Sequence, residues 1–202
     1  MAIEYRRTRQ LRLLFSIYCV PIILALALLS TTVFAVPTQY SLSVSSVAQK
    51  IWYNNPSWVR CANCPTNYIG CNWCWAATYT SGINYKKQTN WPIWDIVETK
   101  QGTSLIRCEG ATTSTLPSLL NSTYGINSVF YNYKPSTSTI TTNIYSSHNP
   151  LYSSNGSHAT LVYGYYDDGS NFYIEYMDPW YPGFYEVDYS VWGSVKFIKI
   201  AT

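Results

Sequence analysis

The most informative stretch of the chain runs Cys71-Asn72-Trp73-Cys74-Trp75-Ala76-Ala77-Thr78-Tyr79. No proline follows it until residue 92, and Lys86 and Lys87 stand where positive charge favours the C-terminus of a helix. The sequence therefore predicts a helix that begins at Cys74 and ends near Lys87. At such a helix N-terminus a thiol faces free backbone N–H groups and the positive end of the helix dipole, which is the environment of a reactive cysteine.

A thiol attacks a peptide carbonyl well only as the thiolate, so a catalytic cysteine needs an imidazole beside it. The chain has two histidines, His148 and His158. His158 precedes a strand-like run over residues 159–166, which can hold its ring rigidly. His148 stands beside Asn149-Pro150 in a predicted loop, and we expect it to be structural. His158 is therefore the predicted base.

The imidazole also needs an acceptor on its second nitrogen, to fix the tautomer and to stabilise the imidazolium. Residues 167–171, Asp-Asp-Gly-Ser-Asn, are a strong hairpin signal between strand-like runs at 159–166 and 172–178. A hairpin that turns there brings Asp178, at the end of the second run, back beside His158. We therefore predict a triad of Cys74, His158 and Asp178.

The rest of the pattern places helices first and strands second. Further helices are expected over residues 92–100 and 114–122, each followed by a glycine stop signal, and a weaker one over residues 136–147. Strands are expected near residues 129–133, 159–166, 172–178, 184–189 and 194–200. This order predicts an α+β fold.

Three blocks of sequence resemble compact papain-like cysteine peptidases of the C39-like group, and they follow the same order: Asn72-Trp73-Cys74-Trp75-Ala76-Ala77, Ser157-His158-Ala159 and Met177-Asp178-Pro179-Trp180. The resemblance covers most of residues 60–192. It implies a papain-like fold, in which the nucleophile helix packs on a C-terminal antiparallel sheet. It also implies hydrolysis of peptide bonds in a peptide or protein substrate.

This sequence departs from the family pattern at the oxyanion hole, the group of donors that stabilises the negatively charged oxygen of the reaction intermediate. Family members usually carry a glutamine a few residues before the nucleophile, and residues 65–73 contain none. Asn67 is the nearest amide and the expected substitute, although its side chain is shorter by one methylene. Because losing one oxyanion donor costs on the order of a hundredfold in rate, a catalytically weak or inactive binding or structural module is an alternative. Acyl transfer to an amine, as in a transglutaminase or transpeptidase, is another.

Residues 1–35 are predicted to be a signal peptide cleaved after Ala35, because Arg6, Arg7, Arg9 and Arg12 precede a long apolar run. The run also reaches the ~20 residues that span a bilayer, so it is alternatively a membrane anchor. Residues 36–60 are expected to be an extended arm or short pro-segment, and residues 61–202 the peptidase domain. The expected location is extracellular or at the outer face of the cell membrane, with membrane contact only through an uncleaved N-terminal segment.

The net charge of +3 belongs to this leader, since the basic and acidic residues after it are equal in number. The rest of the chain has no basic cluster, which argues against a nucleic-acid partner.

Five cysteines follow the leader, and an odd number in an exported chain leaves one thiol unpaired. The resemblance implies that Cys71 pairs with Cys108. Cys61 and Cys64 then pair with each other, which leaves Cys74 free. The spacing of Cys61, Cys64, Cys71 and Cys74 also fits a tetrahedral zinc site. An oxidising destination and the odd count argue against zinc, so we predict no metal, and no motif suggests an organic cofactor.

Overall fold

The computed structural model describes residues 35–52, 68–102 and 107–202. Within these ranges, helix α2 (Cys74–Lys87) is the central helix. Ten consecutive residues of α2, from Trp75 to Asn84, are buried. A helix buried on all sides needs uncharged and often small residues, which is what this segment contains before Lys86. The helix ends where Gln88 adopts a left-handed conformation with φ of 53°. The predicted nucleophile helix is confirmed with both of its bounds.

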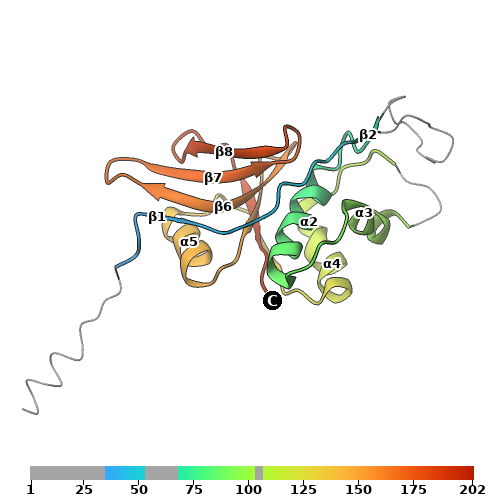
Figure 1. Ribbon diagram of the computed structural model, residues 1–202, viewed down its shortest axis with the longest axis horizontal. Coiled ribbons are helices and arrows are strands. Elements are labelled where there is room, and N and C mark those ends of the chain that lie inside the picture. Colours follow the sequence, from blue (N-terminus) through green and yellow to red (C-terminus); the bar gives the residue numbers. More distant parts are fainter. Residues whose placement is uncertain (1–34, 53–67, 103–106) are drawn as a thin grey trace, which may run out of the picture. The chain divides into compact units, whose positions relative to one another are not determined.

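Two shorter helices follow, α3 (Ile93–Gln101) and α4 (Leu116–Tyr124) (Figure 1). Helix α3 packs against α2, and α4 packs against α3. A 3₁₀ turn, η2 (Thr113–Thr115), leads into α4. Gly102 and Gly125 end α3 and α4 with φ of 78° and 59°, values that favour glycine because it has no Cβ. Both predicted helices are therefore confirmed.

A seven-stranded antiparallel sheet takes six strands from the second half of the described chain and a seventh, β1 (Gln39–Ser41), from the N-terminal arm. Its main path follows the order β4 (Val129–Tyr131), β9 (Lys196–Lys199), β5 (Leu151–Ser154), β6 (Ala159–Asp167), β7 (Phe172–Asp178) and β8 (Gly183–Asp188). The five predicted strands are all present, while β5 is an additional one. The weak helix predicted between β4 and β5 is α5 (Thr137–Thr141), continued by one π-helical turn, η3 (Thr142–Ser146).

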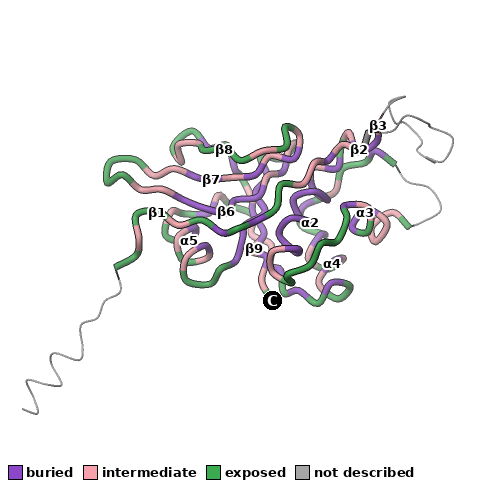
Figure 2. The backbone as a smooth tube through the Cα atoms, viewed as in Figure 1, coloured by how far each residue is buried: buried purple, intermediate pink, exposed green. Residues whose placement is uncertain are grey.

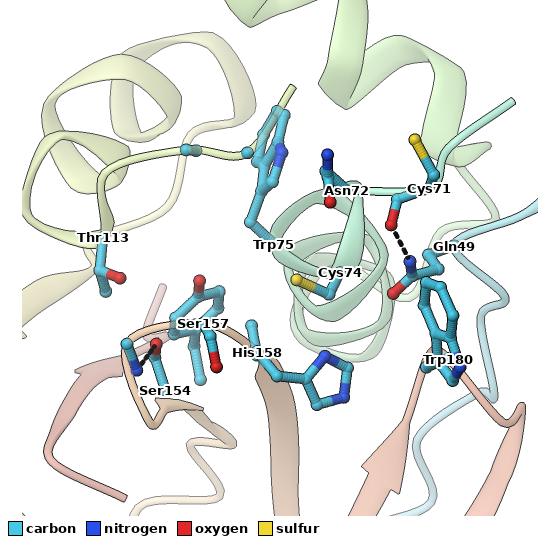
Figure 3. Close-up of a pocket in the computed structure, with 15 residues that line it drawn as sticks. Gln49, Cys71, Asn72, Cys74, Trp75, Thr113, Ser154, Ser157, His158 and Trp180 are labelled. Atoms are coloured by element: carbon cyan, nitrogen blue, oxygen red, sulfur yellow. Dashed lines mark hydrogen bonds between the residues drawn. The ribbon is translucent and has the colours of Figure 1, made fainter. Parts of the chain in front are cut away.

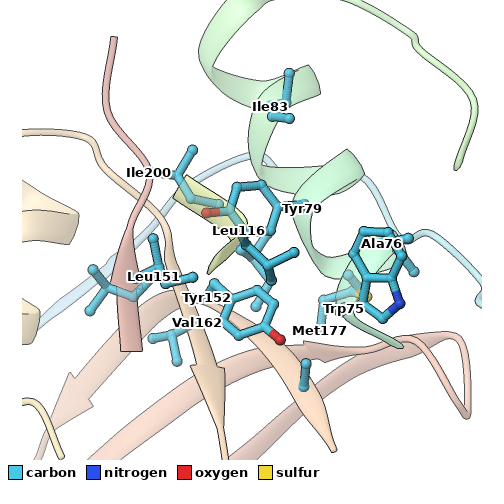
Figure 4. Close-up of a cluster of buried hydrophobic side chains, with 14 of the residues drawn as sticks. Trp75, Ala76, Tyr79, Ile83, Leu116, Leu151, Tyr152, Val162, Met177 and Ile200 are labelled. Atoms are coloured by element: carbon cyan, nitrogen blue, oxygen red, sulfur yellow. The ribbon is translucent and has the colours of Figure 1, made fainter. Parts of the chain in front are cut away.

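The main core lies where α2 packs on the sheet (Figures 2 and 4). The rings of Tyr79 on α2 and Tyr152 on β5 lie 5.5 Å apart, and the Tyr79 hydroxyl donates a hydrogen bond of 3.2 Å to Ser128 Oγ. Gly82 lets the helix approach the last strand closely, because a Cβ there would lie 2.4 Å from Ile200 Cδ1. The sheet and the nucleophile helix therefore meet in tight contact.

An N-terminal arm joins the sheet to the nucleophile loop. Its strand β1 (Gln39–Ser41) pairs with the C-terminal half of β6. The Ser41 hydroxyl and the Gln39 amide both donate hydrogen bonds to the buried Glu175 carboxylate. The arm then forms a small second sheet, in which β2 (Ile51–Trp52) pairs with β3 (Tyr68–Ile69). Strand β3 ends one residue before Gly70, where the nucleophile loop begins.

The leader predicted over residues 1–35 lies almost wholly outside the described residues, as do residues 53–67 of the predicted arm and early domain. Within the described ranges, no helix is long and apolar enough to cross a membrane. The predicted boundaries of leader, arm and domain stay predictions.

Candidate active site

Cys74 is the first residue of α2 and is partly exposed. Trp73 stands at the N-cap, where its N–H donates to the Gly70 carbonyl at 3.1 Å and its carbonyl accepts from the Ala77 N–H at 3.0 Å. A tryptophan side chain offers no acceptor for the N–H groups of the first helical turn, so these remain available to an anion near the thiol. The helix dipole favours negative charge at the same place.

His158 lies in the turn between β5 and β6, one residue before β6 begins. Its Nε2 lies 3.0 Å from Asp178 Oδ1, and its ring lines the same cavity as the Cys74 thiol. The interaction with the Cys74 thiol is the largest cause that raises the pKa of His158 above its ordinary value. The charge and hydrogen bond of Asp178 act in the same direction, while burial opposes them. The imidazole is therefore held between a thiol and a carboxylate and is favoured in its charged form.

Asp178 is the last residue of β7, and its position follows from the β6–β7 register. Leu161 pairs with Met177, so the end of β7 lies beside the start of β6. The same Asp178 Oδ1 accepts the Trp180 N–H at 2.7 Å, which fixes the carboxylate within the turn that follows β7. The three residues predicted as a triad are thus brought together by the helix and the hairpin from which they were inferred.

A cavity of about 220 Å³ opens over Cys74 and His158 (Figure 3). Its walls include Trp75 and Thr113 on one side, and Gln49 and Trp180 on the other. Among the described residues that line it, none is a lysine, arginine, aspartate or glutamate. Away from Cys74 and His158, the lining therefore suits an uncharged segment of a ligand.

Gln49 is a residue of this cavity that sequence reasoning missed. It is only 1% exposed, and its backbone N–H donates to the Pro179 carbonyl at 3.0 Å. Its side-chain Nε2 donates to the Cys71 carbonyl at 2.8 Å and the Gly70 carbonyl at 3.2 Å. Among the described residues, its Oε1 finds no hydrogen-bond partner. Gln49 precedes Cys74 by 25 positions, so only the path of the arm could reveal it.

Asn67, the amide that we expected at the oxyanion hole, lies outside the described residues, and so do Cys61 and Cys64. Their predicted roles stay predictions. Within the described residues, no group of histidine, cysteine and acidic side chains is arranged to hold a metal ion.

The disulfide that we expected between Cys71 and Cys108 is not formed, because Cys71 is present as a free thiol. Cys108 Sγ accepts the N–H of Gly70, the residue before Cys71, at 3.3 Å. Burial, followed by the interaction with Cys108, raises the pKa of Cys71 to about 11. Cys74 is likewise a free thiol.

Two solved structures share this arrangement of helices and sheet. One is UfSP from C. elegans, with a TM-score of 0.50 and 13% sequence identity over 86% of this chain. The other is digestive procathepsin L 3 from the larval midgut of Tenebrio molitor, with a TM-score of 0.50 and 10% identity over 85% of this chain. The fold is papain-like. This papain-like chain covers 72% of the procathepsin chain but only 36% of the UfSP chain.

No family model matches the papain-like chain, and no curated protein sequence is significantly similar to it. At 10% to 13% identity, the two structures establish the fold alone.

Proposed function

We propose that this chain is a cysteine peptidase that hydrolyses peptide bonds, with Cys74 as nucleophile, His158 as general base and acid, and Asp178 as the group that orients His158. One observation carries the proposal: His158 Nε2 lies 3.0 Å from Asp178 Oδ1, while the His158 ring and the Cys74 thiol line one cavity at the N-terminus of α2. A nucleophile, its base and an orienting acceptor in one chain of contacts are the geometric signature of nucleophilic catalysis.

The chemistry proceeds in two stages. His158 accepts the proton of the Cys74 thiol, and the thiolate attacks the carbonyl carbon of the peptide bond. When the C–N bond breaks, His158 gives that proton to the leaving amine, which leaves a thioester on Cys74. Water then attacks the thioester while His158 accepts its proton; the C–S bond breaks, His158 returns the proton to the Cys74 sulfur, and the carboxylic acid is released. Asp178 stabilises the imidazolium in both stages.

We further propose that Gln49, rather than Asn67, supplies the amide donor of the oxyanion hole, together with the Cys74 N–H. Both side-chain N–H groups of Gln49 point to carbonyl oxygens, and the bond to Gly70 is the longer at 3.2 Å. Giving up one neutral hydrogen bond costs about 1 kcal/mol. A donor to a developing oxyanion contributes about 3 kcal/mol. Turning one N–H toward the oxyanion is therefore favourable during the reaction.

Placement in the C39-like group rests on the three sequence blocks around Cys74, His158 and Asp178. Among the described residues other than Cys74 and His158, none lines the cavity with a charged acid or base, which favours a substrate with neutral side chains beside the scissile bond. The leader over residues 1–35 supports action outside the cytoplasm or at the outer face of the membrane.

The test is alkylation of the full chain by iodoacetamide from pH 4 to pH 10, with each labelled cysteine identified by peptide mass mapping. Mapping is needed because Cys71 is also a free thiol. We expect rapid labelling of Cys74 near pH 5 that disappears in His158→Ala. The matched control is His148→Asn, because His148 has a φ of 51°, which asparagine tolerates.

Loss of rapid labelling in His158→Ala but not in His148→Asn supports the ion pair, and assays with neutral peptide substrates then follow. The proposal is contradicted if Cys74 labels slowly in wild type and variant alike and its labelling rises only near pH ~8.5, the pKa of an ordinary thiol. That result favours a binding module.

A further inference from the structure

Asn155 makes most of the side-chain hydrogen bonds in the turn that carries His158. Ser154 adds another, since its Oγ accepts the Gly156 N–H at 3.0 Å. Asn155 Oδ1 accepts hydrogen bonds from the His158 backbone N–H at 2.8 Å, from the Ser157 N–H at 3.0 Å and from the Ser157 hydroxyl at 3.1 Å. The Asn155 backbone N–H returns a bond of 3.2 Å to the His158 carbonyl. Both backbone groups of His158 are therefore bonded to the same residue.

The sheet does not hold His158 in this way. The β5–β6 ladder begins with the pair Ser154 and Ala159, so His158 lies one residue outside it. Asn155, Gly156 and Ser157 are exposed, and packing against neighbours therefore contributes little to the order of the turn. The conformation of this turn depends mainly on its own hydrogen bonds, and those of the Asn155 side chain are the most numerous.

The His158 ring is placed from this backbone. The ring is hydrogen-bonded to Asp178 at the end of β7 and shares a cavity with Cys74 at the start of α2, so a rotation of the turn cannot preserve both placements. Displacements of about 1 Å can lower the rate of an enzyme on the order of a hundredfold, even when they originate away from the reacting atoms.

We infer that Asn155 is a positioning residue for His158. It acts through the turn and touches neither the thiol nor the substrate. The inference rests on the proposed function, because the group that Asn155 positions is the proposed base. The property that matters is an acceptor oxygen at the Oδ1 position, which holds the His158 N–H.

The experiment compares Asn155→Ala, Asn155→Ser and Asn155→Asp in the full chain. Alanine removes the acceptor, serine keeps a shorter and uncharged one, and aspartate keeps one of the same length. The matched control is Asp168→Ala, in the turn that joins β6 to β7. Asp168 Oδ1 holds that turn in a similar way, because it accepts hydrogen bonds from the Ser170 and Asn171 N–H groups at 2.8 and 2.7 Å. Asn155-Gly156-Ser157 also fits the Asn-x-Ser pattern of N-glycosylation. The proteins are therefore produced in a bacterial host, which leaves this pattern unmodified.

Two readouts are needed. The first is the rate of Cys74 alkylation near pH 5. We expect a fall of roughly tenfold or more in Asn155→Ala, a smaller fall in Asn155→Ser, and a rate within about threefold of wild type in Asn155→Asp. Asp168→Ala should keep the wild-type rate even where its melting temperature falls, since its turn does not carry the base.

The second readout is the NMR titration of the His158 ring, which follows its contact with Cys74 without any need for catalysis. Loss of that contact in Asn155→Ala lowers the pKa of His158, because the interaction with the Cys74 thiol is the largest cause of the upward shift. A wild-type rate and titration in Asn155→Ala overturn the inference, and so does an aspartate variant as impaired as alanine. If wild type itself shows no rapid labelling, the proposed function fails, and the titration still decides whether Asn155 places the ring.

Discussion

Replacement of Asp178 by asparagine changes the charge of the proposed orienting group but keeps its shape. Asp178 Oδ1 accepts two bonds, from His158 at 3.0 Å and from the Trp180 N–H at 2.7 Å. An asparagine oxygen can accept both, so the turn after β7 should persist. What is lost is the negative charge beside an imidazolium, on a side chain that is only 18% exposed and thus little screened by water.

The magnitude follows from the difference between charged and neutral hydrogen bonds. A bond to a charged group contributes about 1.5–3 kcal/mol and a neutral bond about 0.5–1.5 kcal/mol, so the ion pair of Cys74 and His158 should lose about 1 kcal/mol. This corresponds to a fall of about fivefold in the alkylation rate near pH 5. Asp178→Ala removes the bond entirely and also leaves the Trp180 N–H without its acceptor, so we expect a fall on the order of a hundredfold.

The assay is the alkylation rate of Cys74 measured across pH for wild type, Asp178→Asn and Asp178→Ala. Asp178 raises the pKa of His158. Without its charge the imidazolium deprotonates at lower pH, and the basic limb of the profile moves in that direction. Equal rates and unshifted profiles in all three proteins would refute the role of Asp178 as the orienting carboxylate.

Three further predictions concern stability. The raised pKa of His158 means that its charged form stabilises the fold fully below the ordinary value of 6.5 and that this stabilisation is lost as pH rises through the raised pKa. The melting-temperature advantage of wild type over His158→Ala should therefore shrink from pH 5 to pH 9. Gly82→Ala places a Cβ against the buried side-chain tip of Ile200, while alanine regains about 1 kcal/mol of helix propensity, so the free energy of unfolding should fall by up to about 2 kcal/mol in a urea titration. Tyr79→Phe leaves the buried Ser128 hydroxyl without this donor and should lower it by about 1 kcal/mol; no change would show that the 3.2 Å bond contributes nothing.

Local sequence signals were sufficient for most elements. The uncharged run after Cys74 and the paired lysines gave both ends of α2, and the glycine stops ended α3 and α4 correctly. The turn at Asp168-Gly169 set the β6–β7 register as far as Gly164, and an irregularity between Val162 and Gly164 then shifts it by one residue before Asp178 reaches the start of β6. These features depend on residues within a few positions of each other, so a single sequence can reveal them.

Strand β5 was not predicted, because its four residues, Leu-Tyr-Ser-Ser, carry no alternating pattern and are all buried. It is a strand because β6 and β9 pair with it on both sides. Whether Cys71 and Cys108 form the implied disulfide also could not be predicted from a local pattern. A family pattern indicated that the two residues are neighbours, but it could not decide whether their sulfurs are bonded.

The sequence by itself predicted Cys74, His158 and Asp178 as a triad, because the start of a helix and the end of a hairpin are local features that place each residue along the chain. Only the tertiary structure decided which amide lines the cavity. Gln49 reaches it because β1 pairs with β6 and the arm then extends to the nucleophile loop. That path is set by backbone pairing between segments more than a hundred residues apart in sequence, and no local pattern of residues encodes it.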